Sequence, residues 1–324
     1  MSELAFVIPV FIREGDTAGL NQFKKTLNSI KQQTSEKWSV IIIDDNSQND
    51  ELSFLIEVFT KCVKQKVILH HNQETKRPGA SRNIGIKIAK EALDSEYVMF
   101  IDADDINDLK RVEETKNIIQ YSHPDVIYSH FIPIDSNDLE INISKLSYSI
   151  QHIMLALLST PSGKNIWREM LLGKAYVNLT SSTTVKIDLA MKFPFSEDIH
   201  CEDVCTWLQY GMYGASYYYT PNIPSLYRIP DVKAGSISRG YIGNDRFNHD
   251  FVRSVIRGLN TGIPFLLKEG IAPEYIKLLM IKYMDLVECT LKQDGFINEI
   301  DKIEELMIRY KSESTLYLNE SVFT

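Results

Sequence analysis

Short apolar runs alternate with amphipathic segments along about the first 130 residues of the chain. The apolar runs are rich in Val, Ile and Phe, and each is long enough to form a strand that is buried on both faces. We predict such strands at residues 4–8, 39–43, 66–70 and 97–101, with Pro9 stopping the first strand. Apolar residues at helical spacing predict helices at 20–33, 52–59 and 84–92. This order predicts an α/β fold with a parallel sheet, right-handed crossovers and helices that cover the sheet.

The pattern is less regular in the remainder of the chain. A helix at about 106–121 and a strand at 125–129 continue the alternation, whereas residues 130–147 are polar and form either a loop or an irregular hairpin. We predict short helices at 150–158 and 166–172, a strand at 183–187, a helix from Glu202, a strand at 216–219 and a loop at 228–243. Helical periodicity begins again at about residue 246. We therefore expect one large domain at 1–240 and a helical region at 241–324.

The composition is that of a soluble globular protein, with 44% hydrophobic and 24% charged residues in a length of 324. The net charge of −8 argues against a general nucleic-acid binder, although it does not exclude binding of one nucleotide. Four cysteines without a paired framework favour a reducing compartment. We find no signal peptide and no apolar run of about 18 residues or more. These features predict a cytoplasmic protein, and they are compatible with peripheral attachment to the cytoplasmic face of a membrane.

Acidic residues follow two of the predicted strands at the point where each strand ends. The strand at 97–101 is followed by Asp102, Asp104 and Asp105, and the strand at 39–43 is followed by Asp44 and Asp45. The carboxyl ends of parallel strands meet at one edge of the sheet, where open α/β folds bind ligands. Asp102 and Asp104 are two positions apart, so an extended chain points both carboxylates to one side. Paired carboxylates suit Mg²⁺ or Mn²⁺. A second interpretation stays open, in which Asp104 and Asp105 cap the following helix.

Several segments resemble, in the same order, the motifs of family 2 glycosyltransferases of the GT-A fold. They are residues 6–11 (FVIPVF), 43–47 (IDDNS), 79–83 (GASRN), 100–105 (FIDADD) and 193–203, within a stretch of about residues 3–230. The resemblance implies a Rossmann-like, mixed but mostly parallel sheet flanked by helices, with a C-terminal helical appendage. It also implies inverting transfer of a sugar from a nucleotide diphosphate donor with Mn²⁺ or Mg²⁺, in bacterial polysaccharide or glycan synthesis. Residues 1–129 would form the nucleotide-binding half and residues 130–240 the acceptor half.

The resemblance assigns several residues to the nucleotide. Asp45 stands where the family reads the base, and a carboxylate can accept the imide N–H that uracil has and cytosine lacks. We therefore expect a UDP-sugar. Pro9, Val10 and Phe11 would line the nucleotide through backbone and ring contacts, and Arg82 stands where the family has a basic residue close to it.

The resemblance also assigns the metal and the catalytic base. Asp102, Ala103 and Asp104 match the D-x-D motif, with Asp104 as the direct metal ligand and Asp102 on the ribose or on a metal-bound water. Asp203 matches the general base that takes the proton of the acceptor hydroxyl. The alternative is that Asp203 or Glu202 caps the predicted helix. If Asp203 is the base, Glu202 would contact the acceptor or support the loop.

The loop after the predicted base departs from the family pattern. Many relatives carry a His or aromatic signature there, whereas this chain has Ser236, Ser238 and Arg239. We expect these three residues on the acceptor side, or on the diphosphate when the loop closes. The chain also lacks the Gln-x-x-Arg-Trp motif of processive relatives, which favours addition of single sugars.

Two other classes of function stay open. One is a non-catalytic nucleotide- or sugar-binding module of the same fold, and the other is a sugar nucleotidyltransferase. The second would have a Gly-rich basic loop after the first strand, whereas residues 13–19 are of mixed charge. The expected partners are a nucleotide sugar and a glycan, lipid-linked or other hydroxyl acceptor, with no nucleic acid. Whether the C-terminal helices form a homodimer is also open.

Overall fold

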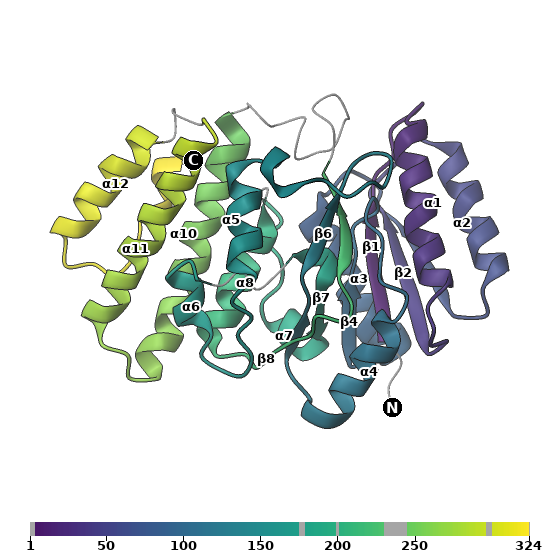
Figure 1. Ribbon diagram of the computed structural model, residues 1–324, viewed down its shortest axis with the longest axis horizontal. Helices are drawn as coiled ribbons and strands as arrows, with labels where there is room; N and C mark the ends of the chain where they lie inside the picture. The colour runs from purple at the N-terminus through teal and green to yellow at the C-terminus, as the bar shows by residue number, and fades with distance from the viewer. Residues whose placement is uncertain (1–3, 175–178, 199–200, 230–244, 296–299, 324) are drawn as a thin grey trace. The chain divides into compact units, whose positions relative to one another are not determined.

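The computed structural model describes residues 4–174, 179–198, 201–229, 245–295 and 300–323 (Figure 1). The chain forms two compact units whose segments interleave along the sequence. Unit 1 comprises residues 1–140, 178–197 and 218–229, and unit 2 comprises residues 141–177, 198–217 and 230–324. The domain boundaries predicted from the sequence, after residues 129 and 240, differ from the limits of these two units. The predicted division into a nucleotide-binding half, an acceptor half and a helical region stays a prediction.

A seven-stranded sheet has the strand order β3-β2-β1-β4-β7-β5-β8. Strands β1 (Leu4–Val10), β2 (Trp38–Asp44), β3 (Val67–His71) and β4 (Tyr97–Phe100) are parallel. Strand β7 (Thr183–Lys186) runs antiparallel to both β4 and β5 (Val126–Tyr128), and β8 spans Tyr217–Tyr219. The sheet is therefore mixed but mostly parallel, which confirms the predicted fold class.

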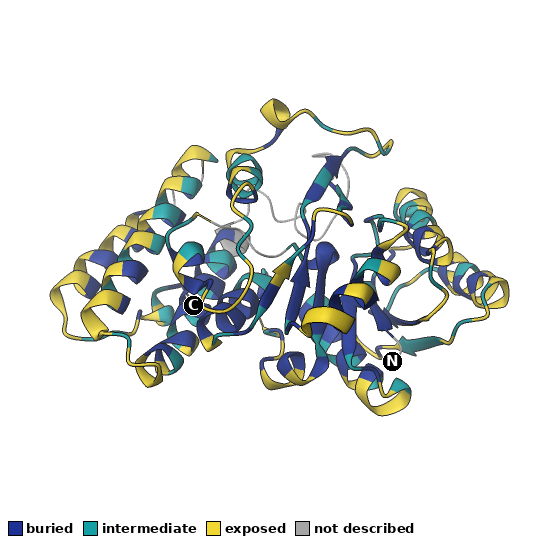
Figure 2. Cartoon of the chain, turned by 60° about the horizontal axis from the view of Figure 1, so that its bottom comes forward, coloured by how far each residue is buried: buried dark blue, intermediate teal, exposed yellow. Residues whose placement is uncertain are grey.

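Helices of unit 1 cover both faces of this sheet. Helices α1 (Thr17–Lys31), α2 (Asp50–Cys62) and α4 (Arg111–Ser122) share one apolar core with alternate residues of β1, β2 and β4. Helix α3 (Pro78–Leu93) packs against Val7, which points to the other face of β1. Figure 2 shows the central strands in dark blue as buried elements. Burial on both faces explains why β1 and β2 are continuous apolar runs.

Pro9 does not end the first strand, contrary to the prediction. Strand β1 continues through Pro9 to Val10, which pair with Ile43 and Asp44 of β2. The backbone of Val10 faces β2, because its carbonyl accepts the N–H of Asp45. The backbone of Pro9 therefore faces the β4 side, where β4 has already ended at Phe100. The missing N–H of proline costs no ladder hydrogen bond at this position.

Two helix starts differ from the prediction. Helix α4 begins at Arg111 instead of about residue 106, and its N-cap position is Lys110. Asp104 and Asp105 therefore do not cap α4, and the capping interpretation of these acids is wrong. Helix α3 begins earlier than the sequence pattern indicated, with Pro78 in its first turn, where the absent N–H has no helical partner.

A small second sheet lies in segments that the sequence pattern left as loops. Strand β6 (Phe131–Ile134) pairs in parallel with β9 (Ser225–Arg228), although residues 130–147 were predicted to be a loop or hairpin. Each strand has four residues, and β6 contains Pro133, so neither produced a recognisable alternation. Helix α7 (Ile187–Lys192) and the 3₁₀ turn η2 (Thr180–Ser182) complete the regular elements described in unit 1.

Unit 2 is helical, as predicted for the C-terminal part of the chain. Its helices are α5 (Tyr148–Ala156), α6 (Trp167–Leu171), α8 (Glu202–Tyr213), α10 (Asp245–Lys268), α11 (Pro273–Gln293) and α12 (Ile300–Ser312), with 3₁₀ turns η1 (Ile143–Lys145) and η3 (Glu320–Phe323). Helix α10 packs closely on α8, because a Cβ atom at Gly258 would lie 3.0 Å from the carbonyl oxygen of Cys205. None of the helices in the described residues is long and apolar enough to cross a membrane.

The contact between α3 and β1 predicts a test of the fold. A Cβ atom at Gly85 would lie 2.4 Å from Cγ1 of Val7, so Gly85→Val overfills the α3–β1 interface. We expect this variant to lose about 1–3 kcal/mol of unfolding free energy in urea titrations. Lys87→Val places the same residue on the exposed side of α3 and should cost less than about 1 kcal/mol. Equal losses in the two variants would contradict the packing described here.

Candidate functional site

The carboxylate of Asp45 anchors the polar loop that precedes α3. Asp45 is 3% exposed, and its Oδ1 accepts the backbone N–H of Lys76 at 2.8 Å and the amide of Asn72 at 2.7 Å. The hydroxyl of Ser81 donates to Oδ1 at 3.3 Å, and the N–H of Arg77 donates to Oδ2 at 3.0 Å. Within the part of the chain that the structure describes, Oδ2 accepts this one bond, so it retains room for a further donor.

The ends of β1 and β2 are joined beside this carboxylate. The carbonyl of Val10 accepts the N–H of Asp45 at 2.8 Å. The side chain of Val10 lies in the apolar core, so only its backbone is available to a ligand at this edge. Pro9 and Phe11 are partly exposed. The structure thus brings together the residues of β1 and β2 that the sequence assigned to the nucleotide.

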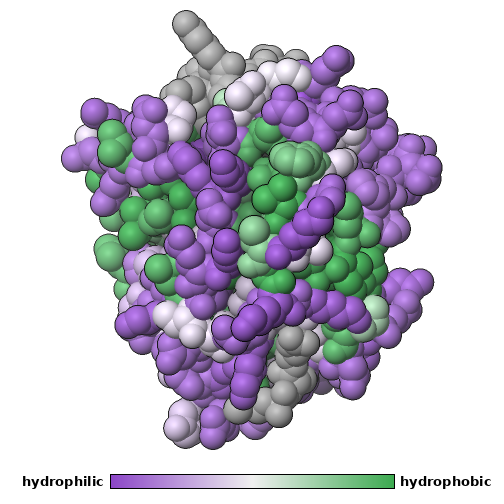
Figure 3. All heavy atoms as spheres, turned by 90° about the vertical axis from the view of Figure 1, so that its right-hand side faces the viewer, coloured by the Kyte–Doolittle hydropathy of each residue, from purple (hydrophilic) through white to green (hydrophobic). Residues whose placement is uncertain are grey.

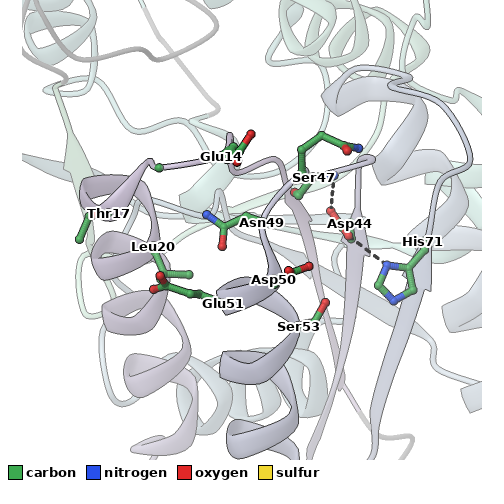
Figure 4. A pocket seen from close by; sticks show the side chains of 12 residues that line it. Glu14, Thr17, Leu20, Asp44, Ser47, Asn49, Asp50, Glu51, Ser53 and His71 are labelled. Atoms are coloured by element: carbon green, nitrogen blue, oxygen red, sulfur yellow. Dashed lines mark hydrogen bonds and ion pairs between the residues drawn. The ribbon is translucent and has the colours of Figure 1, made fainter.

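A separate cavity of about 510 Å³ adjoins the first turns of α1 and α2 (Figure 4). Asp44 lines it, accepting the N–H of Ser47 at 3.0 Å and hydrogen-bonding Nδ1 of His71 at 3.0 Å. Asp44, the last residue of β2, and the adjacent Asp45 therefore have different partners. None of the predicted site residues that the structure describes lines this cavity.

Arg82 of α3 pairs with the first acid of the D-x-D motif. Its Nη2 donates to Oδ1 of Asp102 at 2.7 Å, and its guanidinium lies 5.3 Å from the ring centroid of Phe195. The Arg82 side chain is 5% exposed, whereas Asp102 is 31% exposed. Arg82 is thus fixed beside Asp102, and its charge compensates a carboxylate at the sheet edge.

The neighbouring residue of α3 holds a different segment. Oδ1 of Asn83 accepts the N–H of Phe195, and its Nδ2 donates to the carbonyl of Phe195, each at 2.9 Å. Nδ2 also donates to Glu197 at 2.9 Å. The ring of Phe195 packs edge-on against Phe100, the last residue of β4. Sequence reasoning missed this role of Asn83, although the residue lies inside the motif at 79–83.

The three acids after β4 differ in environment. Burial, and then the Asp102 carboxylate, raise the pKa of Asp104 to about 6. Burial also raises the pKa of Asp105 well above its usual range, with a further contribution from Asp104. Asp105 is fully buried, and its carboxylate accepts the hydroxyl of Ser181 at 2.5 Å and the N–H of Arg228 at 2.7 Å. Asp105 is therefore a structural acid.

Two buried residues, Ser181 and Arg228, bind the backbone of the D-x-D turn. The hydroxyl of Ser181 also accepts the N–H of Asp102 at 3.0 Å. Nε of Arg228 donates to the carbonyl of Asp104 at 2.8 Å, and its Nη2 reaches Asp138 at 2.6 Å. Sequence reasoning missed Ser181 and Arg228, because neither stands in a motif and both act across distant strands.

The carboxylates of Asp102 and Asp104 fit a divalent cation that a substrate helps to bind. Among the described residues, no group of three His, Cys, Asp or Glu side chains could enclose a metal by itself. Mg²⁺ is usually held by one or two carboxylates together with phosphate oxygens and water, so two acids suffice here. Burial is the main cause of the raised pKa of Asp104, and a cation would offset the second cause, repulsion by Asp102.

Asp203 is the second residue of α8 and belongs to unit 2, whereas Asp45, Asp102 and Asp104 belong to unit 1. The N-cap position of α8 is Cys201, so the interpretation of Asp203 or Glu202 as its N-cap is wrong. Oδ1 of Asp203 accepts the N–H of Val204 at 2.9 Å, while Glu202 is 8% exposed. The helix start favours the ionised form of Asp203.

The remaining predicted site residues are Ala103 and the loop residues Ser236, Ser238 and Arg239. The carbonyl of Ala103 accepts the hydroxyl of Thr26 in α1 at 2.9 Å, which ties the D-x-D turn to that helix. The three loop residues lie outside the described residues.

The family model described as Glycosyl transferase family 2 matches residues 6–177. The chain belongs to this family. The match includes β1, β2, α3 and β4, which carry the resemblance found in the sequence. The predicted family is therefore confirmed.

Curated relatives match shorter stretches of the chain. An uncharacterised glycosyltransferase of Rickettsia felis is 28% identical over 129 residues, which are 40% of this chain and 19% of that protein. TarP of Staphylococcus aureus, a poly(ribitol-phosphate) beta-N-acetylglucosaminyltransferase, is 28% identical over 134 residues, or 40% of this chain and 37% of that protein. The match thus spans about a fifth of the length of the Rickettsia relative.

Solved structures match over nearly the whole chain. S. aureus TarS in complex with UDP-GlcNAc has a TM-score of 0.56 and 14% identity, covering 96% of this chain and 87% of that chain. A mannosyltransferase of Pyrobaculum calidifontis with GDP-Man and Mn²⁺ has a TM-score of 0.53 and 12% identity, covering 99% and 84%. At these identities the likeness shows the fold, and it agrees with the predicted GT-A class.

The four donors to Asp45 predict a stability effect in this family 2 chain. Asp45→Asn replaces one carboxylate oxygen with an NH₂ group, which then faces the backbone N–H of either Lys76 or Arg77, and it should lower the unfolding free energy by about 2 kcal/mol in urea titrations. Asp50→Asn is the matched control, because Asp50 is exposed in the first turn of α2 and should lose less than about 1 kcal/mol. The prediction fails if both variants are equally stable.

Proposed function

We propose that the chain is an inverting, metal-dependent glycosyltransferase that moves a sugar from a UDP-sugar to a hydroxyl of a glycan or lipid-linked acceptor. One observation carries the proposal. The acids of β2 and β4 lie at the carboxyl edge of parallel strands in unit 1, where open α/β folds bind nucleotides. Asp45 is rigidly held there, and Asp102 and Asp104 follow β4 in a turn that Ser181 and Arg228 support.

The choice of uracil rests on Asp45. Its Oδ2 can accept one more hydrogen bond, and the uracil imide offers one N–H. The TarS structure contains UDP-GlcNAc, which agrees with this choice, whereas the Pyrobaculum mannosyltransferase contains GDP-Man. Thymine has the same imide N–H as uracil, and guanine also presents N–H donors to a carboxylate, so thymine and guanine nucleotides are the competitors. Val10 would contribute backbone contacts, and Pro9 and Phe11 would contact the base or ribose with their rings.

The metal would be held by Asp104, with Asp102 on the ribose or on a metal-bound water. A bound Mn²⁺ or Mg²⁺ supplies Lewis-acid stabilisation of the diphosphate leaving group. Arg82 has a supporting role in this proposal, because its charge is already paired with Asp102. It would hold the Asp102 carboxylate in a fixed orientation before the nucleotide enters.

Asp203 would act as the general base. In an inverting transfer the acceptor hydroxyl attacks as UDP departs, and the hydroxyl must lose its proton near the transition state. A carboxylate in the first turn of α8 is favoured in the ionised form that a base needs. Glu202 is buried and would support the loop more than it would contact the acceptor.

The acceptor is a polyhydroxylated polymer or lipid-linked sugar in this proposal, in line with the poly(ribitol-phosphate) named for TarP. Ser236, Ser238 and Arg239 would contact the acceptor or the diphosphate. We further propose that the enzyme acts in the cytoplasm, at the cytoplasmic face of the membrane where lipid-linked acceptors are found. Dimerisation through the C-terminal helices is part of the same hypothesis.

A nucleotide panel tests the donor site. We expect UDP with Mn²⁺ to raise the melting temperature more than UDP alone, and more than CDP, dTDP or GDP with Mn²⁺, because a ligand that binds only the native state stabilises it. Asp104→Ala should remove most of the increment due to Mn²⁺. A preference for GDP would refute the uracil assignment, and no response to any nucleotide would favour a non-catalytic module.

The base is tested by Asp203→Asn. This variant should lower the rate of sugar transfer or donor hydrolysis by at least about a hundredfold, with UDP affinity by calorimetry nearly unchanged. Asp301→Asn is a matched control, since Asp301 is also an acid in the first turn of a unit 2 helix. Near-normal turnover by Asp203→Asn would rule out this residue as the base.

A further inference from the structure

Helix α10 packs against α8 (Figure 1), and one of its side chains binds the start of α8. The hydroxyl of Ser254 accepts the N–H of Cys205 at 3.0 Å and donates to the carbonyl of Cys201 at 2.5 Å. Ser254 is fully buried. Cys201 occupies the N-cap position with a φ of 58° and makes no side-chain capping bond, while Ser254 bridges the Cys201 carbonyl and the Cys205 N–H from another helix. Asp203 lies between the two residues that Ser254 contacts.

One turn further along α10, Arg257 holds the chain ahead of α8. Its Nη1 and Nη2 donate to Oδ1 and Oδ2 of Asp198 at 2.6 and 3.1 Å, the two-pronged geometry that an arginine forms with a carboxylate. This hydrogen bonding holds the pKa of Asp198 below its usual range. Asp198 and Cys201 are thus both tied to α10, close before Asp203 in sequence.

A third partner comes from the C-terminal segment. Arg257 also donates to Glu320 of η3, and Arg253 lies 3.4 Å from Glu320 and 3.5 Å from Asp198. Glu320 is itself held in place, because Asn260 of α10 makes two hydrogen bonds to the backbone of Leu318, at 2.8 and 2.9 Å. Arg253 also pairs with Asp250 at 3.3 Å, so two arginines and three acids form one connected network.

We infer that Arg257 and Glu320 are positioning residues that fix the start of α8 and thereby the Asp203 carboxylate. The inference rests on the proposed function, since it takes Asp203 as the base. Isolated surface ion pairs contribute little to global stability. A connected network on a short segment instead limits local motion. A reacting group displaced by about 1 Å can lose about a hundredfold in rate, so local order here has a catalytic consequence.

The same contacts give the C-terminal segment a role at the site. Removing the carboxylate of Glu320 leaves Arg257 with one acid, and the network then loses the link that runs from η3 through α10 to Asp198. A merely structural network would change the melting temperature and leave the rate of the folded enzyme intact. A positioning network changes kcat while binding of the nucleotide stays constant.

The test uses Arg257→Gln and Glu320→Gln in the full chain, with Arg257→Lys as the conservative variant. Lys292→Gln is the matched control, because Lys292 of α11 also pairs with two acids, Glu288 and Glu304, in unit 2. The readouts are hydrogen exchange of the peptide covering residues 201–213, UDP affinity, and kcat and KM for hydrolysis of UDP-GlcNAc. If Arg257→Gln does not fold, Glu320→Gln still tests the inference.

We expect exchange in this peptide to rise about tenfold in both Gln variants and kcat to fall about tenfold, with KM and UDP affinity unchanged. Arg257→Lys should lie between wild type and Arg257→Gln, and Lys292→Gln should match wild type. Unchanged exchange overturns the inference, as does faster exchange with an unchanged kcat. If the wild-type chain binds UDP but hydrolyses no UDP-GlcNAc, other UDP-sugars replace it in the assay. If the chain hydrolyses none of the UDP-sugars, the proposed function is contradicted and the catalytic role of the network is overturned. The hydrogen exchange of residues 201–213 still reports whether the network orders the start of α8.

Discussion

The fully buried carboxylate of Asp105 is the constraint on which the candidate site depends. A carboxylate withdrawn from water is tolerated only when hydrogen bonds replace its hydration. Its two partners come from η2 and β9, which lie far from Asp105 in sequence. Because Ser181 also binds the N–H of Asp102, and Arg228 also binds the carbonyl of Asp104, the contacts that satisfy Asp105 shape the turn that presents the two other acids. The residues that stabilise unit 1 by satisfying Asp105 therefore also set the geometry of its acidic edge.

The acids at the strand ends differ in burial and in how many hydrogen bonds they accept from the chain itself. Asp44, Asp45 and Asp105 are nearly or fully buried and accept bonds from the chain itself. Asp102 and Asp104 are less buried, and one of them is paired with Arg82. Neighbouring positions of one motif therefore differ in role. The same holds for Arg82, which orients the Asp102 carboxylate, and Asn83, which binds the backbone of Phe195.

Sequence reasoning succeeded where the relevant physics is local or periodic. The central strands were predictable because burial on both faces requires a continuous apolar run, and the start of α8 was predictable from its acids. It failed where a distant partner decides the structure. Strand β6 forms because β9, about ninety residues later, pairs with it. Helix α4 does not start at about residue 106, because the backbone of Ile106 pairs with Leu226 of β9. Motif matching identified Arg82 but not Ser181, because a serine in a serine- and threonine-rich stretch carries no signal of its own.

The interleaving of the two units has a consequence for how the chain is made. The polypeptide passes between the units after residues 140, 177, 197, 217 and 229, so no single cut separates one unit from the other. During synthesis the first four strands emerge early, but β7, which pairs with both β4 and β5, emerges more than eighty residues after β4. While the intervening residues are synthesised, the edge of β4 that pairs with β7 in the folded protein therefore lacks this partner. Pairing between strands far apart in sequence is also slow to form.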